Sequence, residues 1–481
     1  MSLTEMYEAV QAAWVEGRLE NVLQRQKELV RLHKILEESR SDLMAAVSED
    51  VEVSGPNALR EVDLALDAIQ QLYDQLDSPS ALAKEKSVQA GHSSPLNSVA
   101  LGPVLIQAAL PCPISSAILP LAAAVAAGSC CLVLLCTESP AVSRVLRTAI
   151  RNSLDYEAVG VMDEFLSPRD LSSLYFESAV LQDSTTGLEF ATVLRQTNPT
   201  VRVHIPALGL PAIFIDRSTP ALELAAQWVK DSVQNSGINH TGRMPRICFV
   251  DEFVIEKFHS IMQNYNENSD KAWAPLPEST MTEEIARKFK SLFPSLGKKH
   301  ELLRLTVLQS TDPINAETMG QVARLLTQSY KGILLVPTCS LDHGIDLWNK
   351  VNSGMSAAAT YIFGQDRETW YLARFLKSDH CFINCIPPRS FAMIAPSSTQ
   401  DTFTLPYRPE DFSTNKVILR DSSPASPRGL LDLKRIAQTP GGQLSYFEQG
   451  LIVGLSITAL AVSGLVFAIF KGFKGYYQWR G

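Results

Sequence analysis

The sequence predicts an α/β protein with two doubly wound parallel-sheet domains, preceded by N-terminal helices and followed by a C-terminal transmembrane helix. Short apolar segments alternate with helical runs from Val104 to Phe363, which is typical of parallel sheets covered by helices on both faces. Hydrophobic residues make up 46% of the 481 residues and charged residues 20%, which indicates a folded globule. Near the C-terminus, twenty consecutive residues carry no charge.

The elements follow one another in a regular order. Residues 1 to about 78 carry apolar side chains at helical spacing, and Gly91 to Pro95 marks a break after them. The strand candidates are 104–108, 130–135, 203–205, 213–215, 247–250, 305–308, 332–337 and 358–363. The helix candidates are 114–127, 139–153, 188–196, 219–234, 315–329 and 341–351.

The uncharged stretch, Leu451 to Phe470, predicts a single membrane span. Twenty residues of helix measure about 30 Å, the thickness of the hydrocarbon core of a bilayer. Lys471 and Lys474 follow the stretch, and aromatic residues flank it on both sides. Glu5 and Glu8 stand where a signal peptide would need basic and apolar residues. We therefore expect a tail-anchored protein whose bulk lies in the cytosol. We expect its anchor in the membrane of the endoplasmic reticulum rather than in the mitochondrial outer membrane or the peroxisome.

Charge and cysteine content exclude several classes of protein. The net charge of −8 provides no basic face, so we expect no nucleic-acid partner. The eight cysteines form no Cys-x-x-Cys pairs, which argues against a zinc site, against any other metal centre and against a disulfide scaffold. Cys381 and Cys385 beside His380 favour buried thiols at the start of a strand over a ligand cluster. Asn239 begins a glycosylation sequon, which matters only if the domain lies outside the cytosol.

Several collinear segments resemble the aldehyde dehydrogenase superfamily, specifically its membrane-anchored class 3 (fatty aldehyde dehydrogenase-like) branch. Residues 113–128 are similar to the family segment LPLxxAlaAGN, and residues 183–187 to the cofactor turn GSTxVG with one residue lost. Residues 207–216 resemble ELGGKsPaiVD, and residues 235–240 stand where NaGQtC belongs. Further matches are residues 340–349, 361–363, 383–384 and 411–419, the last of which is characteristic of the class 3 branch.

The resemblance implies an aldehyde dehydrogenase-like fold and a division of the chain into seven parts. We expect an N-terminal helical segment, a Rossmann-like cofactor-type domain, a catalytic-type α/β domain, a returning C-terminal segment, a flexible tether, the membrane helix and a basic tail. Their respective ranges are 1–90, 91–216, 217–400, 401–420, 421–450, 451–470 and 471–481.

The family oxidises aldehydes with a cysteine nucleophile, an asparagine that stabilises the oxyanion and a glutamate that activates water. In this sequence the nucleophile position falls on His240 and the oxyanion position on Pro111. The position of the glutamate falls on Ala207, or on Ile205 if the gap is placed elsewhere. Every position with a chemical role has therefore changed, which predicts a degenerate active site. Cys112 is the alternative nucleophile, because it could enter the same cleft.

The family also implies NAD(P) as cofactor. Ser184, Thr185 and Gly187 are the candidate binding residues, because a tight turn at a helix N-terminus favours an anion. The lysine that holds the ribose falls on Leu134 or Leu135, and the glutamate that holds the other ribose falls near Thr327 or Gln328. We therefore expect dinucleotide binding that is weak or absent.

Two functions of different classes follow from the resemblance. The first is a catalytically inactive scaffold or partner subunit at the bilayer, a homo-oligomer or a hetero-oligomer with an active relative, because the family commonly forms dimers. The alternative is an active oxidoreductase that converts a lipophilic aldehyde to its acid with NAD(P), within a biosynthetic pathway. A third interpretation is a binding pocket for a long-chain aldehyde or acid without catalysis.

Overall fold

A computed structural model describes most of the chain. The described residues are 2–50, 55–77, 79–80, 83, 96–110, 112–183, 186–234, 243–267, 306–309, 332–394, 405–417 and 446–479. Contacts divide the chain into two compact units, Met1–Leu419 and Arg420–Gly481.

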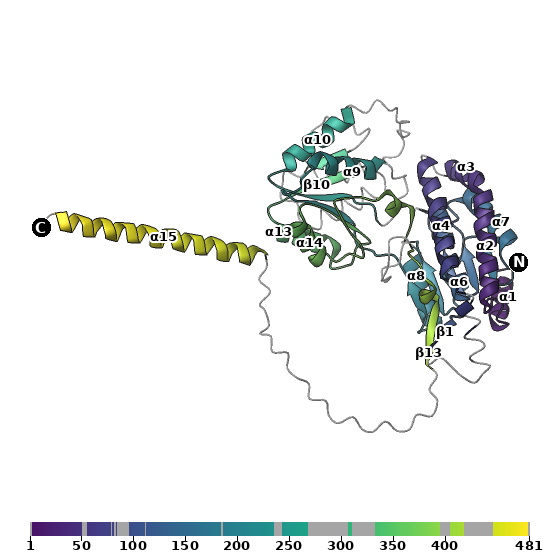
Figure 1. Ribbon diagram of the computed structural model, residues 1–481. Coiled ribbons are helices and arrows are strands. Elements are labelled where there is room, and N and C mark those ends of the chain that lie inside the picture. The colour runs from purple at the N-terminus through teal and green to yellow at the C-terminus, as the bar shows by residue number, and fades with distance from the viewer. Residues whose placement is uncertain are drawn as a thin grey trace, which may run out of the picture. The chain divides into compact units, whose positions relative to one another are not determined.

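The first unit begins with helices that pack beside one another (Figure 1). They are α1 (Leu3–Val15), α2 (Val22–Glu38), α3 (Arg40–Asp50) and α4 (Gly55–Gln75). A capping box between Ser2 and Glu5 starts α1, and the Asn21 side chain caps α2. Leucines of α2 and α4, among them Leu32 and Leu72, are fully buried against α6 and α7, so these helices dock on the sheet that follows.

The first sheet has five parallel strands in the order β4-β3-β2-β5-β6. The strands are β2 (Val104–Gln107), β3 (Cys131–Leu134), β4 (Val159–Met162), β5 (Ser178–Leu181) and β6 (Arg202–His204). The helices between them are α6 (Pro113–Ala127), α7 (Pro140–Ser153) and α8 (Gly187–Thr197), with a short 3-10 helix, η1 (Pro168–Leu171). Every residue of α6 is buried, which explains why its sequence is apolar on all sides.

The second sheet has six parallel strands in the order β12-β11-β7-β8-β10-β9. The strands are β7 (Ala212–Ile215), β8 (Ile247–Asp251), β9 (Thr306–Gln309), β10 (Gly332–Thr338), β11 (Thr360–Phe363) and β12 (Cys381–Ile383). Two helices cover each face: α9 (Leu222–Gln234) and α10 (Ile255–Glu267) on one, α13 (Leu341–Asn352) and α14 (Asp366–Phe375) on the other (Figure 1). Successive side chains of a strand point to opposite faces of the sheet. Ile213 therefore packs in the hydrophobic core on one face and Phe214 in the core on the other.

Two parallel sheets covered on both faces confirm the predicted α/β, doubly wound fold. The returning chain adds β13 (Ser413–Val417), which pairs antiparallel with β1 (Leu96–Ala100). Two further 3-10 helices, η2 (Pro388–Ala392) and η3 (Pro409–Phe412), precede it. The helix candidate 315–329 lies outside the described residues.

The second unit contains α15 (Tyr446–Trp479), within which the predicted span 451–470 falls. In the part of the chain that the structure describes, no helix has the combination of length and apolar character needed to cross a membrane. The side chains of Leu465, Phe467, Ala468 and Phe470 lie outside that description.

Candidate functional site

Two of the predicted functional residues, Pro111 and His240, lie outside the described residues. Their nearest described neighbours are Cys112, which follows Pro111 directly, and Arg243, three residues after His240. Cys112 contacts the carbonyl of Phe391 in η2, and Tyr361, whose hydroxyl donates to the Arg243 carbonyl, lies 3.4 Å from the hydroxyl of Ser390 in the same turn, so both segments lie near η2. The meeting point is a buried polar cluster, called the Arg243 cluster below. Its buried members are Glu61, Cys112, Arg243, Tyr361 and Tyr407, and the half-buried His380 lies at its edge.

The Arg243 cluster lies between the two sheets. Arg243 precedes β8 and His380 precedes β12, so both stand at the amino end of strands of the second sheet. Cys112 begins α6, which follows β2 of the first sheet, and its Sγ lies 3.4 Å from the carbonyl oxygen of Phe391 in η2. The carboxyl edge of one sheet therefore faces the amino edge of the other at this cluster.

Arg243 is a buried cation with few partners. Arg243 is only 3% exposed to solvent. Its carbonyl oxygen accepts a hydrogen bond of 2.8 Å from the Tyr361 hydroxyl, and its Nη2 lies 3.5 Å from Nδ1 of His380. Burial, and then the charge of Arg243, lower the pKa of His380, so its imidazole is neutral and Nδ1 is able to accept. Nε and Nη1 of Arg243 have no hydrogen-bond partner among the described residues.

Cys112 is fully buried, which opposes ionisation of its thiol. Burial, followed by the charge of Glu61, raises the pKa of the Cys112 thiol well above its usual value. A thiolate is the reactive form of cysteine, and a buried thiol in apolar surroundings stays protonated. Cys112 as a replacement for the missing nucleophile stays a prediction, with a burial that favours the protonated thiol.

Glu61 occupies the N-terminus of α6. Its Oε2 accepts backbone hydrogen bonds from Ile114 (3.0 Å) and Ser115 (3.2 Å). Burial raises the pKa of the Glu61 carboxyl to about 8, against the effect of these two bonds. Because both bonds reach Oε2, Oε1 is free to carry the proton. Asp50 caps the next helix similarly, accepting 2.9 and 2.8 Å bonds from Ala141 and Val142 at the start of α7.

These two carboxylates fill helix N-termini at the edge where parallel sheets bind anionic ligands. The third helix, α8, begins at Gly187, and its N-cap Thr186 makes no side-chain capping bond. The Thr186 hydroxyl accepts from Nε2 of Gln107 (2.7 Å) and donates to Asp183 (3.0 Å). A Cβ on Gly187 would lie 3.4 Å from Leu181, an ordinary contact, so space does not require a glycine there. Ser184 and Thr185, the other cofactor candidates, lie outside the described residues.

Thr327 and Gln328, the candidates for the glutamate that holds the other ribose, lie outside the described residues. The described positions Ala207, Leu134 and its alternative Leu135 are apolar and buried. Ala207 is 9% exposed and lies in the segment that joins β6 to β7. Leu134 ends β3, is 6% exposed and supplies no hydrogen-bond donor at the position of the ribose lysine. Buried apolar side chains at both places preserve packing and carry no polar chemistry.

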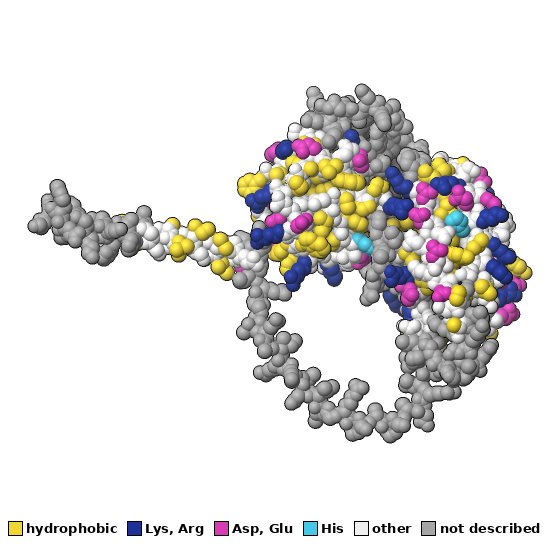
Figure 2. All heavy atoms as spheres, viewed as in Figure 1, with side chains coloured by type: hydrophobic (Ala, Val, Ile, Leu, Met, Phe, Trp, Pro, Cys, Tyr) yellow, Lys and Arg dark blue, Asp and Glu magenta, His cyan; other side chains and the backbone are white. Residues whose placement is uncertain are grey.

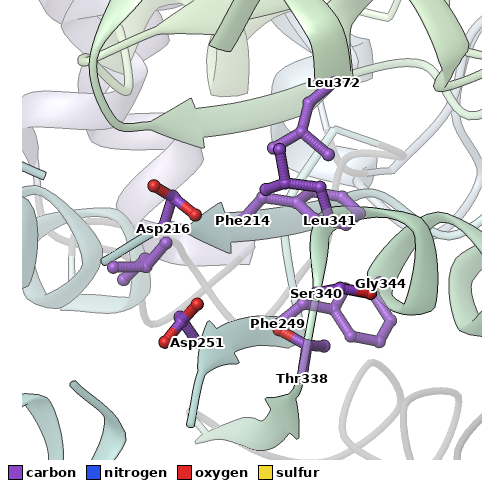
Figure 3. Close-up of a pocket in the computed structure, with 10 residues that line it drawn as sticks. Phe214, Asp216, Phe249, Asp251, Thr338, Ser340, Leu341, Gly344 and Leu372 are labelled. Carbon is purple, nitrogen blue, oxygen red and sulfur yellow. The ribbon is translucent and has the colours of Figure 1, made fainter. Parts of the chain in front are cut away.

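A small pocket lies at the opposite edge of the second sheet, where β7, β8 and β10 end (Figure 3). Asp216 and Asp251 lie on one side of it, and Leu341 and Leu372 on the other. Asp251 accepts from Nε of Arg217 at 3.0 Å. The pocket has room for about one water molecule. The pocket is therefore too small for a dinucleotide or a long-chain aldehyde.

Sequence reasoning missed Glu61 and Arg243. A signal for Glu61 exists, because it stands four, seven and eleven residues before Ala65, Ala68 and Leu72, which are all buried on one face of α4. No comparable pattern marks Arg243.

Within the described ranges, no three histidine, cysteine or acidic residues come together as a metal site. His380 precedes β12, which begins at Cys381 as expected, and the thiols of Cys381 and Cys385 are half-buried rather than buried.

Comparison with known proteins adds to this geometry. Residues 2–162 match the aldehyde dehydrogenase family. No curated protein matches the chain. Among solved structures, Staphylococcus aureus AldH is 17% identical with a TM-score of 0.68, covering 89% of this chain and 96% of that one. A NAD-dependent benzaldehyde dehydrogenase from Corynebacterium glutamicum is 14% identical with a TM-score of 0.65, covering 87% and 88%. An aldehyde dehydrogenase from Bartonella henselae is 15% identical with a TM-score of 0.63, covering 85% and 89%.

The chain therefore has the aldehyde dehydrogenase fold. Its first third, residues 2–162, is also similar in sequence to the aldehyde dehydrogenase family.

Proposed function

We propose that this protein is a catalytically inactive relative of the class 3 aldehyde dehydrogenases and acts as a scaffold or partner subunit at a membrane. The observation that carries the proposal is Ala207, a buried methyl group at the position of the water-activating glutamate. His240 and Pro111, at the nucleophile and oxyanion positions, support it from the sequence. Loss of one oxyanion donor costs roughly 10²–10³ in rate, and loss of a nucleophile on the order of 10⁶.

The cofactor site supports the same proposal. The α8 turn with Thr186 and Gly187 keeps an uncapped helix N-terminus, which favours a phosphate. Leu134 replaces the side chain that would hold the ribose, so a dinucleotide would lose a charge-assisted hydrogen bond there. We infer that NAD(P) binds weakly or not at all.

The proposed membrane tether rests on Leu451 to Phe470. In the second unit, the described side chains of α15 are exposed, with Leu455 62% and Leu460 73% exposed (Figure 2). A continuous exposed apolar surface indicates a partner, and a bilayer suits twenty uncharged residues. The endoplasmic reticulum is the proposed membrane, and the proposed protein partner is a second copy of this chain or an active relative.

Turnover and cofactor binding are tested on the purified full-length protein, with AldH of Staphylococcus aureus as a positive control. We expect no acid from aldehydes of increasing chain length with NAD or NADP, and no rise in the thermal unfolding midpoint with either dinucleotide. A ligand at 100 times its Kd would stabilise the protein by about 2.7 kcal/mol, an easily measured shift. Acid formation by the partner-free protein would overturn the proposal and support the alternative, an active oxidoreductase for lipophilic aldehydes.

The tether is tested by replacing Leu455 and Leu460 together with arginine. Arginine near the centre of a span opposes membrane insertion, so we expect the variant to move from the membrane pellet to the soluble fraction. Leu224→Arg on α9 is the control, because Leu224 is also 56% exposed but lies outside the proposed span. If the double variant stays in the pellet after alkaline extraction, α15 does not anchor the chain through this stretch.

A further inference from the structure

The Arg243 cluster has one property that the proposed function does not use: an uncompensated positive charge. Burying a cation without a partner is strongly unfavourable, so buried arginines normally pair with carboxylates. Arg243 is 3% exposed, and its Nε and Nη1 have no hydrogen-bond partner among the described residues. Its only described side-chain hydrogen bond is the 3.5 Å contact with His380, a neutral group.

The titratable groups around Arg243 do not neutralise it. Cys112 is a protonated thiol, and burial raises the pKa of Tyr361 and of Tyr407, so both phenols are neutral. The carboxylate of Asp379 contributes a favourable charge, but no ion pair joins it to Arg243 among the described residues, and its Oδ1 accepts from the Ser356 hydroxyl at 3.0 Å.

Glu61 also leaves the charge of Arg243 uncompensated. Its carboxyl is bound to the N-terminus of α6 and favours the protonated form at neutral pH. The unpaired N–H groups of Arg243 therefore lie beside neutral groups. An anion from outside the chain could accept hydrogen bonds from them and balance the charge.

We propose that Arg243 anchors a binding site for the carboxylate of an organic acid between the two sheets. The unpaired N–H groups of the guanidinium donate hydrogen bonds to the carboxylate oxygens. The neighbouring apolar side chains contact the rest of the acid. A carboxylate fits better than a phosphate group, because one cation balances one negative charge, whereas a phosphate monoester carries nearly two.

The surroundings favour an organic acid over an inorganic ion. Cys112 belongs to a small buried apolar cluster with Ala109 and Ile394. Tyr361 stacks on Phe382, with ring centroids 5.4 Å apart. An apolar chain would gain by leaving water beside these groups, which a chloride or sulfate ion could not do.

The proposal concerns binding alone, so it is independent of whether the chain turns over an aldehyde. The probe is octanoate, added without a nicotinamide to the full-length protein in detergent, with octanol as the uncharged probe of equal length. We expect octanoate to raise the thermal unfolding midpoint in a saturable manner, and octanol, acetate and sodium chloride to have little effect.

The deciding variant is Arg243→Met, which keeps the apolar stem and removes the donors. We expect octanoate affinity to fall roughly 10–100-fold, the usual effect of losing hydrogen bonds to a charged group. Arg243→Lys restores the charge and should recover part of the affinity. Arg217→Met is the control for net charge, because Arg217 is half exposed at the opposite edge of the sheet.

Three outcomes would overturn the proposal. The first is equal octanoate binding by the parent and Arg243→Met proteins. The second is an equal shift with octanol, which would indicate a hydrophobic site without an anion anchor. The third is an equal shift with chloride, which would indicate a small-ion site. If Arg243→Met does not fold, Arg243→Lys against Arg217→Lys gives the same comparison with the charge retained.

Discussion

Replacing Glu61 with glutamine should make the protein more stable at pH 8 and nearly unchanged at pH 5. Burial in the folded state raises the pKa of Glu61 to about 8, against an ordinary value of 4.5. Between these two values the folded protein holds a proton that the unfolded chain has released. The stability that this proton contributes is fully present below about pH 4.5 and is lost as the pH rises toward 8.

The size of the effect follows from the same shift. One pKa unit corresponds to about 1.36 kcal/mol, so the difference between parent and variant should reach a few kcal/mol at pH 8. Glutamine cannot ionise, and its amide oxygen still accepts the bonds from Ile114 and Ser115. The measurement is urea unfolding of both proteins from pH 5 to pH 9, with the difference in free energy plotted against pH. That difference removes the contributions of His204 and His380, which titrate in both proteins.

Asp50→Asn is the matched control. Asp50 also accepts two backbone bonds at a helix N-terminus, but it is partly exposed. A carboxylate at a helix N-terminus interacts favourably with the helix dipole, so the asparagine variant should lose about 0.3–1 kcal/mol. Parallel pH curves for the parent and Glu61→Gln proteins would show that Glu61 is ionised in the folded state.

Predictions from the sequence succeeded where the signal is local. The apolar runs at 104–108, 213–215 and 247–250 correspond to β2, β7 and β8, because a buried parallel strand needs continuous apolar residues. β4 and β5 were missed. Gly160 interrupts the apolar residues of β4, and β5 begins with Ser178, which leaves only three apolar residues, Ala179 to Leu181.

The candidate site depended on contacts that are distant in the sequence. Glu61 reaches Ile114 across 53 residues, and Arg243 reaches His380 across 137. Neither pairing has a local pattern, so a sequence alone gives no reason to expect them. The family resemblance identified which positions had lost polar groups, as at Ala207, but it could not show which buried charges had appeared nearby.

Adding one methyl group at Gly209 should destabilise the protein by about 1–3 kcal/mol. Gly209 lies between β6 and β7, two residues after Ala207, and its N–H donates to the Ser356 carbonyl at 2.9 Å. A Cβ at this position would lie 2.5 Å from that carbonyl oxygen and 2.8 Å from its carbon. Both are backbone atoms, so no side chain can move aside, and the whole segment must shift.

Gly344→Ala is the matched control, the same substitution in the same domain. A Cβ there would meet the Phe214 ring at 3.4 Å, an ordinary contact, and Gly344 lies in α13, where alanine is preferred by about 1 kcal/mol. We expect Gly344→Ala to be neutral or slightly stabilising, and Gly209→Ala to lower the urea midpoint. A shift of the Ala207 segment should also reach the neighbouring bonds between Leu210 and Asn352, the shorter of which is 2.6 Å. Equal midpoints for the two variants would mean that the segment tolerates the displacement, and the close approach of Gly209 to Ser356 would then contribute nothing measurable to the position of Ala207.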